Sequence, residues 1–361
     1  MHVPEELICL ILAQVYRENP FFPPDYSTLL SCALVNSQWR GPAQTLLFRR
    51  VTLEAASAFG QFADTTKNRA LLTHVRTLAI ALESPVTTLV SILGHCPQLY
   101  ELSISARGLF SLGPQGISRI AAVVRDASIS VRSLHLIDAS VQSPVLYELL
   151  DLFPTVEFLF LGVEIASAPP ASAPASFHLY ELTLQRTPSS EVLAWLLSTS
   201  GTSLRILELR DLPSPNTYLD LATCCPHLQS LRLMRYNSHS GAILRQCTNL
   251  LELVLLNVPM FTALRELPLT LEHFEVAIQT YTASVDLGLV ISAVNSLPRL
   301  RILTFIGDSE QIPLLQSTCD AKHVTLHATP RKLWIKDDPI KTTRFPRRQS
   351  VSNFYLMNSR T

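Results

Sequence analysis

Apolar positions along this chain recur in one six-residue pattern. Segments such as "CPQLYELSI" (96–104), "CPHLQSLRL" (225–233) and "LPRLRILTF" (297–305) have an apolar residue, two variable residues, an apolar residue, one variable residue and another apolar residue. The last two apolar residues alternate with variable ones, which is the period of a strand with one buried face. The pattern therefore predicts a short strand in each copy.

These copies follow one another at a nearly constant distance. When each copy is marked by its central apolar residue, successive markers are 21 to 32 residues apart. A period of about 25 residues is typical of a repeat architecture, in which each unit is one supersecondary element. The eleven markers are Leu78, Leu102, Leu134, Leu159, Leu182, Leu207, Leu231, Leu253, Phe274, Leu303 and Val324.

The stretches between the predicted strands have helical spacing. Residues 84–96, 143–153 and 190–200 place apolar residues three and four apart, and they begin with Ser or Ser-Pro, which favours a helix start. One strand and one helix cannot bury both apolar faces alone, but stacked neighbours can. The sequence thus predicts an α/β solenoid, with a parallel sheet on the concave face and helices on the convex face. Residues 166–176 contain three prolines, which exclude a helix, and we expect a flexible excursion there.

In period and pattern, residues 74–328 resemble the leucine-rich repeat family. The Asn that usually follows the strand in that family is mostly missing, since Arg107, Leu212 and Tyr236 stand at or near its place. Other groups must then hold the turns, and we expect irregular curvature.

The first fifty residues do not fit the repeat. "VPEELICLILAQVY" predicts a helix with Pro4 at its first position and Glu5 and Glu6 in its first turn. After a Pro-rich loop, a second helical stretch runs to Trp39, and Gly41-Pro42 is expected to end it before the strand-like "RRVTL". An end cap for the repeats is one interpretation of these helices.

The same residues resemble an F-box, which pairs an L-P-x-E-L-x-x-x-I-L opening with a later L-L-x-x-x-x-V-x-x-x-W. The opening is matched by Pro4, Glu6, Leu7, Ile11 and Leu12, and the second part by Leu29, Leu30, Val35 and Trp39. Val3 replaces the usual Leu, and the intervening loop is longer than usual. The whole chain therefore resembles fungal F-box proteins with C-terminal leucine-rich repeats. The expected domains are residues 1–50, the repeats over 51–328 and a basic tail over 329–361.

This resemblance implies a substrate-recognition subunit of an SCF-type cullin–RING ubiquitin ligase. The F-box would bind the Skp-type adaptor, and the repeats would bind a target protein. A leucine-rich repeat scaffold with no ubiquitin-ligase role is the alternative. The residues expected at the adaptor interface are Pro4, Leu7, Ile11, Leu30, Val35 and Trp39.

A target surface follows from strand geometry, because residues flanking the paired apolar ones must face the concave side. Two apolar ends flank a charged middle on that side, a pattern that favours an interface. Alternatively, the Pro-rich excursion covers one apolar end and the C-terminal tail covers the other. Replacing Arg210 and Arg232 with Glu is expected to abolish target capture. The expected target-binding residues are Phe158, Phe160, Glu181, Glu208, Arg210, Arg232, Met234, Val254 and Leu256, with Thr183 on the same face.

Composition and motifs exclude several other classes of protein. The chain is 47% hydrophobic and 16% charged, yet its apolar runs fall short of the ~20 residues of a membrane span. Glu5 and Glu6 stand where a signal peptide would have basic residues, so we expect a soluble, cytoplasmic or nuclear protein. The seven cysteines form no C-x-x-C pair, and no catalytic motif occurs. We therefore expect no metal, no cofactor and no enzyme activity. Cys96, Cys225 and Cys247 precede predicted strands at one position and are expected in the core.

Charge is unevenly distributed although the net charge is zero. Residues 331–361 contain eight Lys or Arg against Asp337 and Asp338, a net charge of +6. Such a tail can contact nucleic acid or an acidic partner, but a solvated end that neutralises the acidic body is the favoured interpretation. Nucleic acid is not the expected partner. "RRQS" (347–350) resembles a basophilic kinase site.

Overall fold

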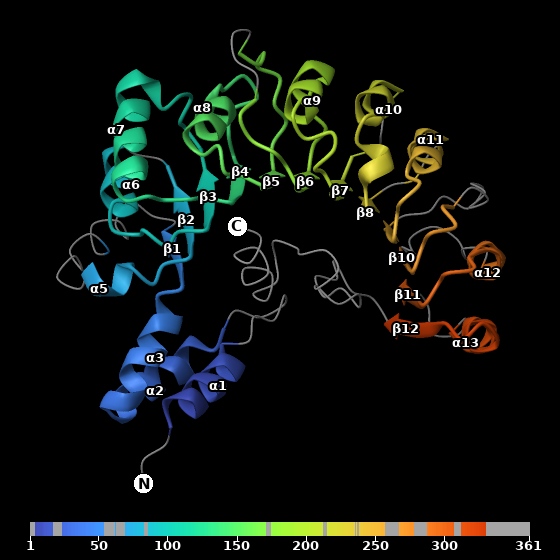
Figure 1. Ribbon diagram of the computed structural model, residues 1–361, viewed down its shortest axis with the longest axis horizontal. Helices are drawn as coiled ribbons and strands as arrows, with labels where there is room; N and C mark the ends of the chain where they lie inside the picture. The colour runs from blue at the N-terminus through green and yellow to red at the C-terminus, as the bar shows by residue number, and fades with distance from the viewer. Residues whose placement is uncertain are drawn as a thin grey trace. The chain divides into compact units, whose positions relative to one another are not determined.

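Figure 1 shows the computed structural model, which has two units. The described residues of the first unit lie within 4–156, and those of the second lie within 157–329. The described residues are 4–16, 24–53, 62, 69–82, 86–170, 175–211, 215–234, 236, 238–256, 267–277, 287–306 and 312–329.

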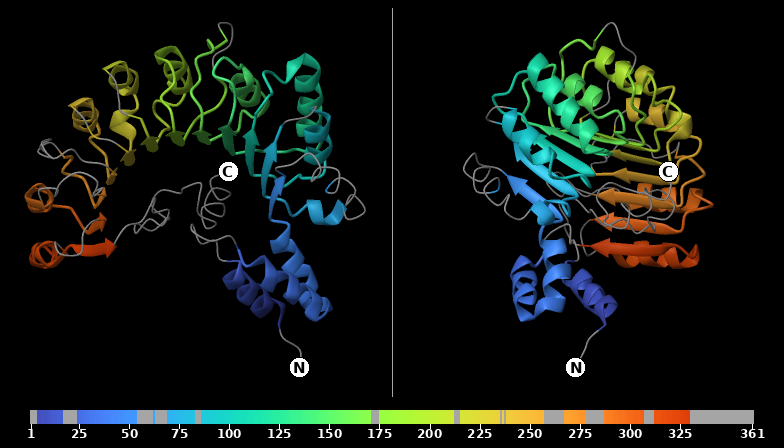
Figure 2. Two further views of the ribbon diagram at one scale, coloured as in Figure 1. Left: turned by 180° about the vertical axis from the view of Figure 1, so that it is seen from behind. Right: turned by 60° about the vertical axis from the view of Figure 1, so that its left-hand side comes forward.

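The first unit begins with three helices gathered in one bundle (Figure 2). They are α1 (Glu5–Val15), α2 (Tyr26–Val35) and α3 (Ser37–Leu47). Asp25 caps α2, and hydrogen bonds from the side chain and backbone of Thr28 lower the pKa of Asp25 to about 2. The buried residues of the bundle are Ile8, Leu12, Tyr16, Leu29, Ala33 and Ala43.

The position of Trp39 differs from the prediction. The second helix ends at Val35, and Trp39 lies in the first turn of α3, because the Asn36 side chain accepts hydrogen bonds from the backbone N–H groups of Gln38 and Trp39 at 2.8 and 3.1 Å. Pro42 lies inside α3, so the prediction that Gly41-Pro42 ends the helix is wrong. Proline removes one helical hydrogen bond, whereas burial of Ala43 in the bundle favours continuation.

The rest of the first unit alternates strands and helices. The strands β1 to β4 pair in parallel in chain order, and β1 confirms the strand expected at "RRVTL". The strands are β1 (Arg50–Leu53), β2 (Thr77–Ala81), β3 (Glu101–Ser105) and β4 (Ser133–Ile137); the helices are α5 (Arg69–Leu72), α6 (Thr87–Leu93), α7 (Gly113–Asp126) and α8 (Val145–Leu152).

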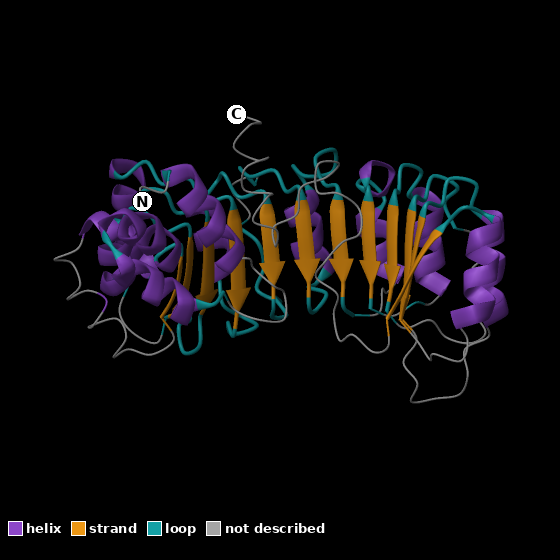
Figure 3. Ribbon diagram, turned by 90° about the horizontal axis from the view of Figure 1, so that it is seen from below, coloured by secondary structure: helices purple, strands orange, loops and turns teal. Residues whose placement is uncertain are grey.

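The second unit repeats this arrangement with parallel strands in chain order and helices on one face of its sheet (Figures 1 and 3). Its strands are β5 (Phe158–Leu161), β6 (Glu181–Leu184), β7 (Ile206–Leu209), β8 (Ser230–Leu233), β9 (Glu252–Leu255), β10 (His273–Ala277), β11 (Ile302–Ile306) and β12 (Thr325–Thr329). Its helices are α9 (Ser190–Leu197), α10 (Pro215–Leu221), the 3-10 turn η2 (Cys225–His227), α11 (Ser238–Gln246), α12 (Leu287–Ser296) and α13 (Ile312–Ala321).

The strand register confirms the predicted repeat. Leu78 is paired with Leu102 and Leu102 with Leu134, and the markers from Leu159 to Leu303 are likewise paired one after another. The last marker is wrong, because Leu303 is paired with Leu326 and not with Val324. The two apolar marker-side positions of β12 are Leu326 and the small Ala328, which pair with Leu303 and Phe305. Val324 and Leu326 have the same spacing two residues earlier in the sequence, which explains the wrong marker.

Hydroxyl groups tie neighbouring repeats together. Thr155, Ser203 and Thr270 each stand three residues before a strand and donate to a backbone carbonyl of the preceding repeat at 2.7–2.8 Å. Each acceptor is the residue two positions before the preceding strand: Val131, Leu179 and Leu250. Because backbone carbonyls next to strands need donors, these hydroxyls help to hold neighbouring repeats in register.

The Pro-rich segment contains no helix in its described residues, 166–170 and 175–176. Residues 171–174 lie outside the described part of the chain. Between β5 and β6 the predicted absence of a helix is therefore confirmed for the residues that the structure describes. None of the described helices is long and apolar enough to span a membrane.

We predict that Leu253→Ala lowers the free energy of unfolding by about 3 kcal/mol, because Leu253 is fully buried between Leu231 and Phe274 and truncation leaves a cavity. Denaturant unfolding followed by circular dichroism measures this change. The control Leu314→Ala makes the same truncation at an exposed position of α13 and should change stability little. Equal losses in both variants would contradict the observed register.

Candidate interaction surfaces

Helices α1 and α2 expose large apolar side chains. Their buried sides form the bundle core, yet their other sides carry leucine, isoleucine and valine at helical spacing. Helices that are apolar all round normally pack against another element, and exposed apolar patches mark interaction sites. The exposed residues are Leu7, Leu10, Ile11, Leu30, Leu34 and Val35, with 48% to 81% of each residue accessible.

Most of the predicted adaptor-binding residues are accessible. Pro4, Leu7, Ile11, Leu30 and Val35 are exposed, whereas Trp39 is half-buried and packs against the bundle core. Leu10 and Leu34 are exposed as well and are not among the predicted residues, although their helical spacing from Leu7 and Leu30 could have indicated them. That the six predicted residues form one contiguous surface stays a prediction.

The predicted target-binding residues lie in the second unit, on the face of the sheet opposite to the marker side chains. Register places Phe158 beside Glu181 in one row, and Phe160, Thr183, Glu208, Arg232 and Val254 in a second row. Arg210, Met234 and Leu256 continue the ladder just beyond the strands, since their N–H groups donate to the carbonyls of Leu184, Leu209 and Leu233. We call this side of β5–β12 the concave face.

Some of the predicted residues on the concave face are buried and others are partly accessible to solvent. Phe158 is fully buried with its ring 5.7 Å from that of Tyr180, and Glu181, Glu208 and Val254 are also buried. The side chains that remain partly accessible are Phe160, Arg210, Arg232, Met234 and Leu256. Side chains in register on strands ~4.8 Å apart shield one another's flanks, an effect that a single repeat does not reveal.

Arg210 is held in place by two neighbours. Its Nε lies 2.8 Å from Glu208 Oε1, and its guanidinium carbon lies 5.5 Å from the centre of the Phe160 ring. The ion pair and the cation–π contact orient the planar guanidinium. Phe160 and Arg210 thus present one ordered, partly accessible surface.

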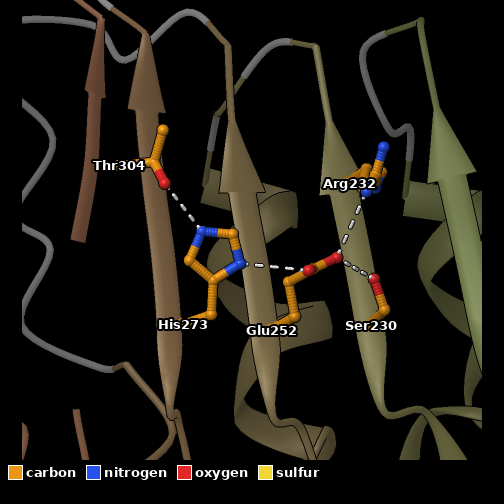
Figure 4. Close-up of polar contacts among 5 residues, drawn as sticks. All are labelled: Ser230, Arg232, Glu252, His273 and Thr304. Atoms are coloured by element: carbon orange, nitrogen blue, oxygen red, sulfur yellow. Dashed lines mark hydrogen bonds and ion pairs between the residues drawn. The ribbon is translucent and has the colours of Figure 1, made fainter. Parts of the chain in front are cut away.

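A buried polar network crosses four strands of the same face (Figure 4). Glu252 is fully buried at its centre, where Oε1 accepts from Ser230 Oγ at 2.6 Å and lies 3.5 Å from Arg232 Nη2. Its Oε2 is 3.0 Å from His273 Nδ1, and His273 Nε2 is 3.0 Å from Thr304 Oγ1. Buried polar groups need such partners, so the network fixes the relative positions of β8 to β11.

The order hydroxyl, imidazole, carboxylate in this network also occurs in acyl-transfer enzymes. There the hydroxyl must reach a substrate, whereas Thr304 is only 4% exposed. The arrangement therefore supports a structural role for Thr304, His273 and Glu252. Among the described residues, no group of His, Cys, Asp or Glu is placed to hold a metal ion.

The cysteines predicted in the core are buried. Cys96, Cys225 and Cys247 are fully inaccessible, as are Cys224 and Cys319. Burial raises the pKa of Cys96 to about 12 and that of Cys319 to about 11. The thiols of Cys96 and Cys319 are therefore protonated at neutral pH, and the buried cysteines act as small apolar core residues.

No protein-family model matches this chain, and no curated protein matches it. Similar solved structures include a leucine-rich repeat protein of Leptospira interrogans, which is 14% identical, with a TM-score of 0.33. The match covers 80% of this chain and 67% of that one. The repeat period, the paired markers and the parallel strands of this chain itself define a leucine-rich repeat type of α/β solenoid. Stacked repeats of this kind form an extended concave surface.

We predict that Glu252→Gln lowers the free energy of unfolding by about 3 kcal/mol, because it removes the buried charge that Arg232, Ser230 and His273 surround. Denaturant unfolding tests this. The control Glu272→Gln breaks a more exposed ion pair with Arg301, at 3.8 Å, and should cost less than about 1 kcal/mol. A Glu252→Gln protein as stable as this control would show that the network is not needed for folding.

Proposed function

We propose that this chain is a two-part receptor, in which α1–α3 act as an F-box that binds a Skp-type adaptor and the repeats bind a target protein. The observation that carries the proposal is the apolar exposure of α1 and α2, with Leu7, Ile11 and Leu30 at positions of the F-box pattern. Exposed apolar surface of this kind marks a site of interaction, and a protein partner would bury it.

The adaptor interface would combine a hydrophobic centre with an aromatic anchor. Apolar side chains on α1 and α2 would be buried by the adaptor, and Trp39 would border them from the first turn of α3. A few residues near an interface centre, often tryptophan, account for most of the binding energy. In a cullin–RING ligase the adaptor would then link the repeats and their target to the ubiquitin-transfer machinery.

Target binding would use the accessible part of the concave face. Phe160, Arg210, Met234 and Leu256 supply apolar and planar charged surface there, the residue types enriched at interface centres. Arg232 is less suited to testing this surface by charge reversal. A glutamate at its position would face the buried Glu252 carboxylate, so the earlier double substitution would test folding as well as recognition.

We predict that Leu30→Asp weakens binding to a purified Skp-type adaptor by about 2 kcal/mol or more, because a carboxylate would be buried at the centre of the interface. Titration calorimetry measures the affinity, and thermal unfolding verifies that the variant is folded. The control Leu314→Asp makes the same change on exposed α13 and should bind normally.

A folded Leu30→Asp protein with wild-type affinity would remove the F-box assignment. No measurable binding by the wild-type chain would do the same. Either result would leave a leucine-rich repeat scaffold without a ubiquitin-ligase role, the alternative considered from the sequence.

We predict that Met234→Glu reduces target capture at least tenfold and leaves adaptor affinity unchanged, since Met234 is a partly accessible apolar residue on the concave face. Quantitative mass spectrometry of affinity-captured proteins compares the variant with the wild type. Leu219→Glu, on an exposed position of α10, is the matched control. If both variants capture the same proteins as the wild type, the concave face is not the recognition surface.

A further inference from the structure

Water does not reach several side chains on the concave face. Val254, Glu275, Thr304 and Ile306 are each at most 5% exposed, although the described helices of the second unit all lie on the opposite side of the sheet (Figure 1). Neighbouring strands ~4.8 Å away shield the flanks of a side chain but leave its tip open. The described helices of the second unit therefore do not account for this burial.

The chemistry of the face defines what could cover it. Its charged residues are four glutamates, Glu181, Glu208, Glu252 and Glu275, against Arg210 and Arg232. With histidines neutral, the face has a net charge of −2, and over β9–β12 its only acidic or basic residues besides histidine are Glu252 and Glu275. Val254, Leu256 and Ile306 add apolar surface beside them. A basic segment with apolar side chains is complementary to this surface.

One segment of this chain has that chemistry and begins close by. Residues 331–348 follow β12, which ends at Thr329, and they contain seven Lys or Arg and two Asp, together with Trp334 and Phe345. Eighteen extended residues can span roughly 60 Å, whereas the seven spacings from β12 to β5 amount to roughly 34 Å. The segment is long enough to reach every strand of the second unit.

We propose that residues 331–348 bind the concave face of the second unit, so that the chain carries its own ligand there and any target must displace it. This inference is independent of adaptor binding by α1–α3. The main competing occupant is the segment 257–266, which follows β9. Its one Arg and one Glu cancel, so charge complementarity favours residues 331–348.

Photo-crosslinking in the full-length chain tests the contact. With p-benzoylphenylalanine in place of Phe345, irradiation should link position 345 to peptides of β8–β11 in the same molecule. The double reversal R347E/R348E should lower this yield at least fivefold. The control R119E/R125E, on exposed positions of α7, changes net charge equally and should not lower it.

Competition in trans provides a second measurement. A labelled peptide of residues 331–348 should bind the full-length R347E/R348E protein at least tenfold more tightly than the wild type. The reason is that the wild-type segment competes at an effective concentration of about millimolar. A scrambled peptide of the same composition is the control. Crosslinks confined to other segments or other molecules, or equal peptide affinity for the two proteins, would overturn the proposal.

Discussion

The repeats of both units depend on burial of each strand's marker side chain between those of its two neighbours. Leu231 is covered by Leu207 and Leu253 in register, and all three are fully buried. No single repeat can achieve this, because a strand of four or five residues has too little apolar surface to offset the entropy of ordering it. Stability is therefore a property of the stack, and an error of one residue in register would turn the leucines to the wrong face.

The strand register also determines which polar side chains contact one another. In the concave rows a side chain has neighbours from adjacent strands on both sides, so a buried carboxylate such as Glu252 can collect donors from β8 and β10 at once. Such a network adds specificity, because Ser230 and His273 lose their partner if either strand slips. The hydroxyls of Thr155, Ser203 and Thr270 act similarly outside the strands, since each bond requires the preceding repeat in its correct place.

The sequence revealed features that are local and missed those that require a neighbour. The L-x-x-L-x-L pattern is contained within one copy, so it located the strands, and it failed only where the small Ala328 let Val324 imitate a marker. Gly41-Pro42 is a strong local stop signal, yet the cap at Asn36 and burial of Ala43 outweigh it. For the candidate surfaces, the F-box pattern predicted apolar residues on α1 and α2 that are exposed in the structure, among them Leu7, Ile11 and Leu30. The burial of Phe158 depends on Tyr180 and could not be read from its own repeat.

The two candidate surfaces differ in a way that favours two kinds of partnership. Leu34 and Val35 are largely exposed on α2, so leaving them in water carries a free-energy cost that a stable partner would remove. On the concave face, the apolar Phe160 instead contacts Arg210, a partly accessible charged residue that is tolerated in water and is paired with the buried Glu208. A surface of that composition can be uncovered and covered again at low cost, as exchange between ligands requires. A stable partner on the helices and reversible recognition by the repeats would thus be compatible within one chain.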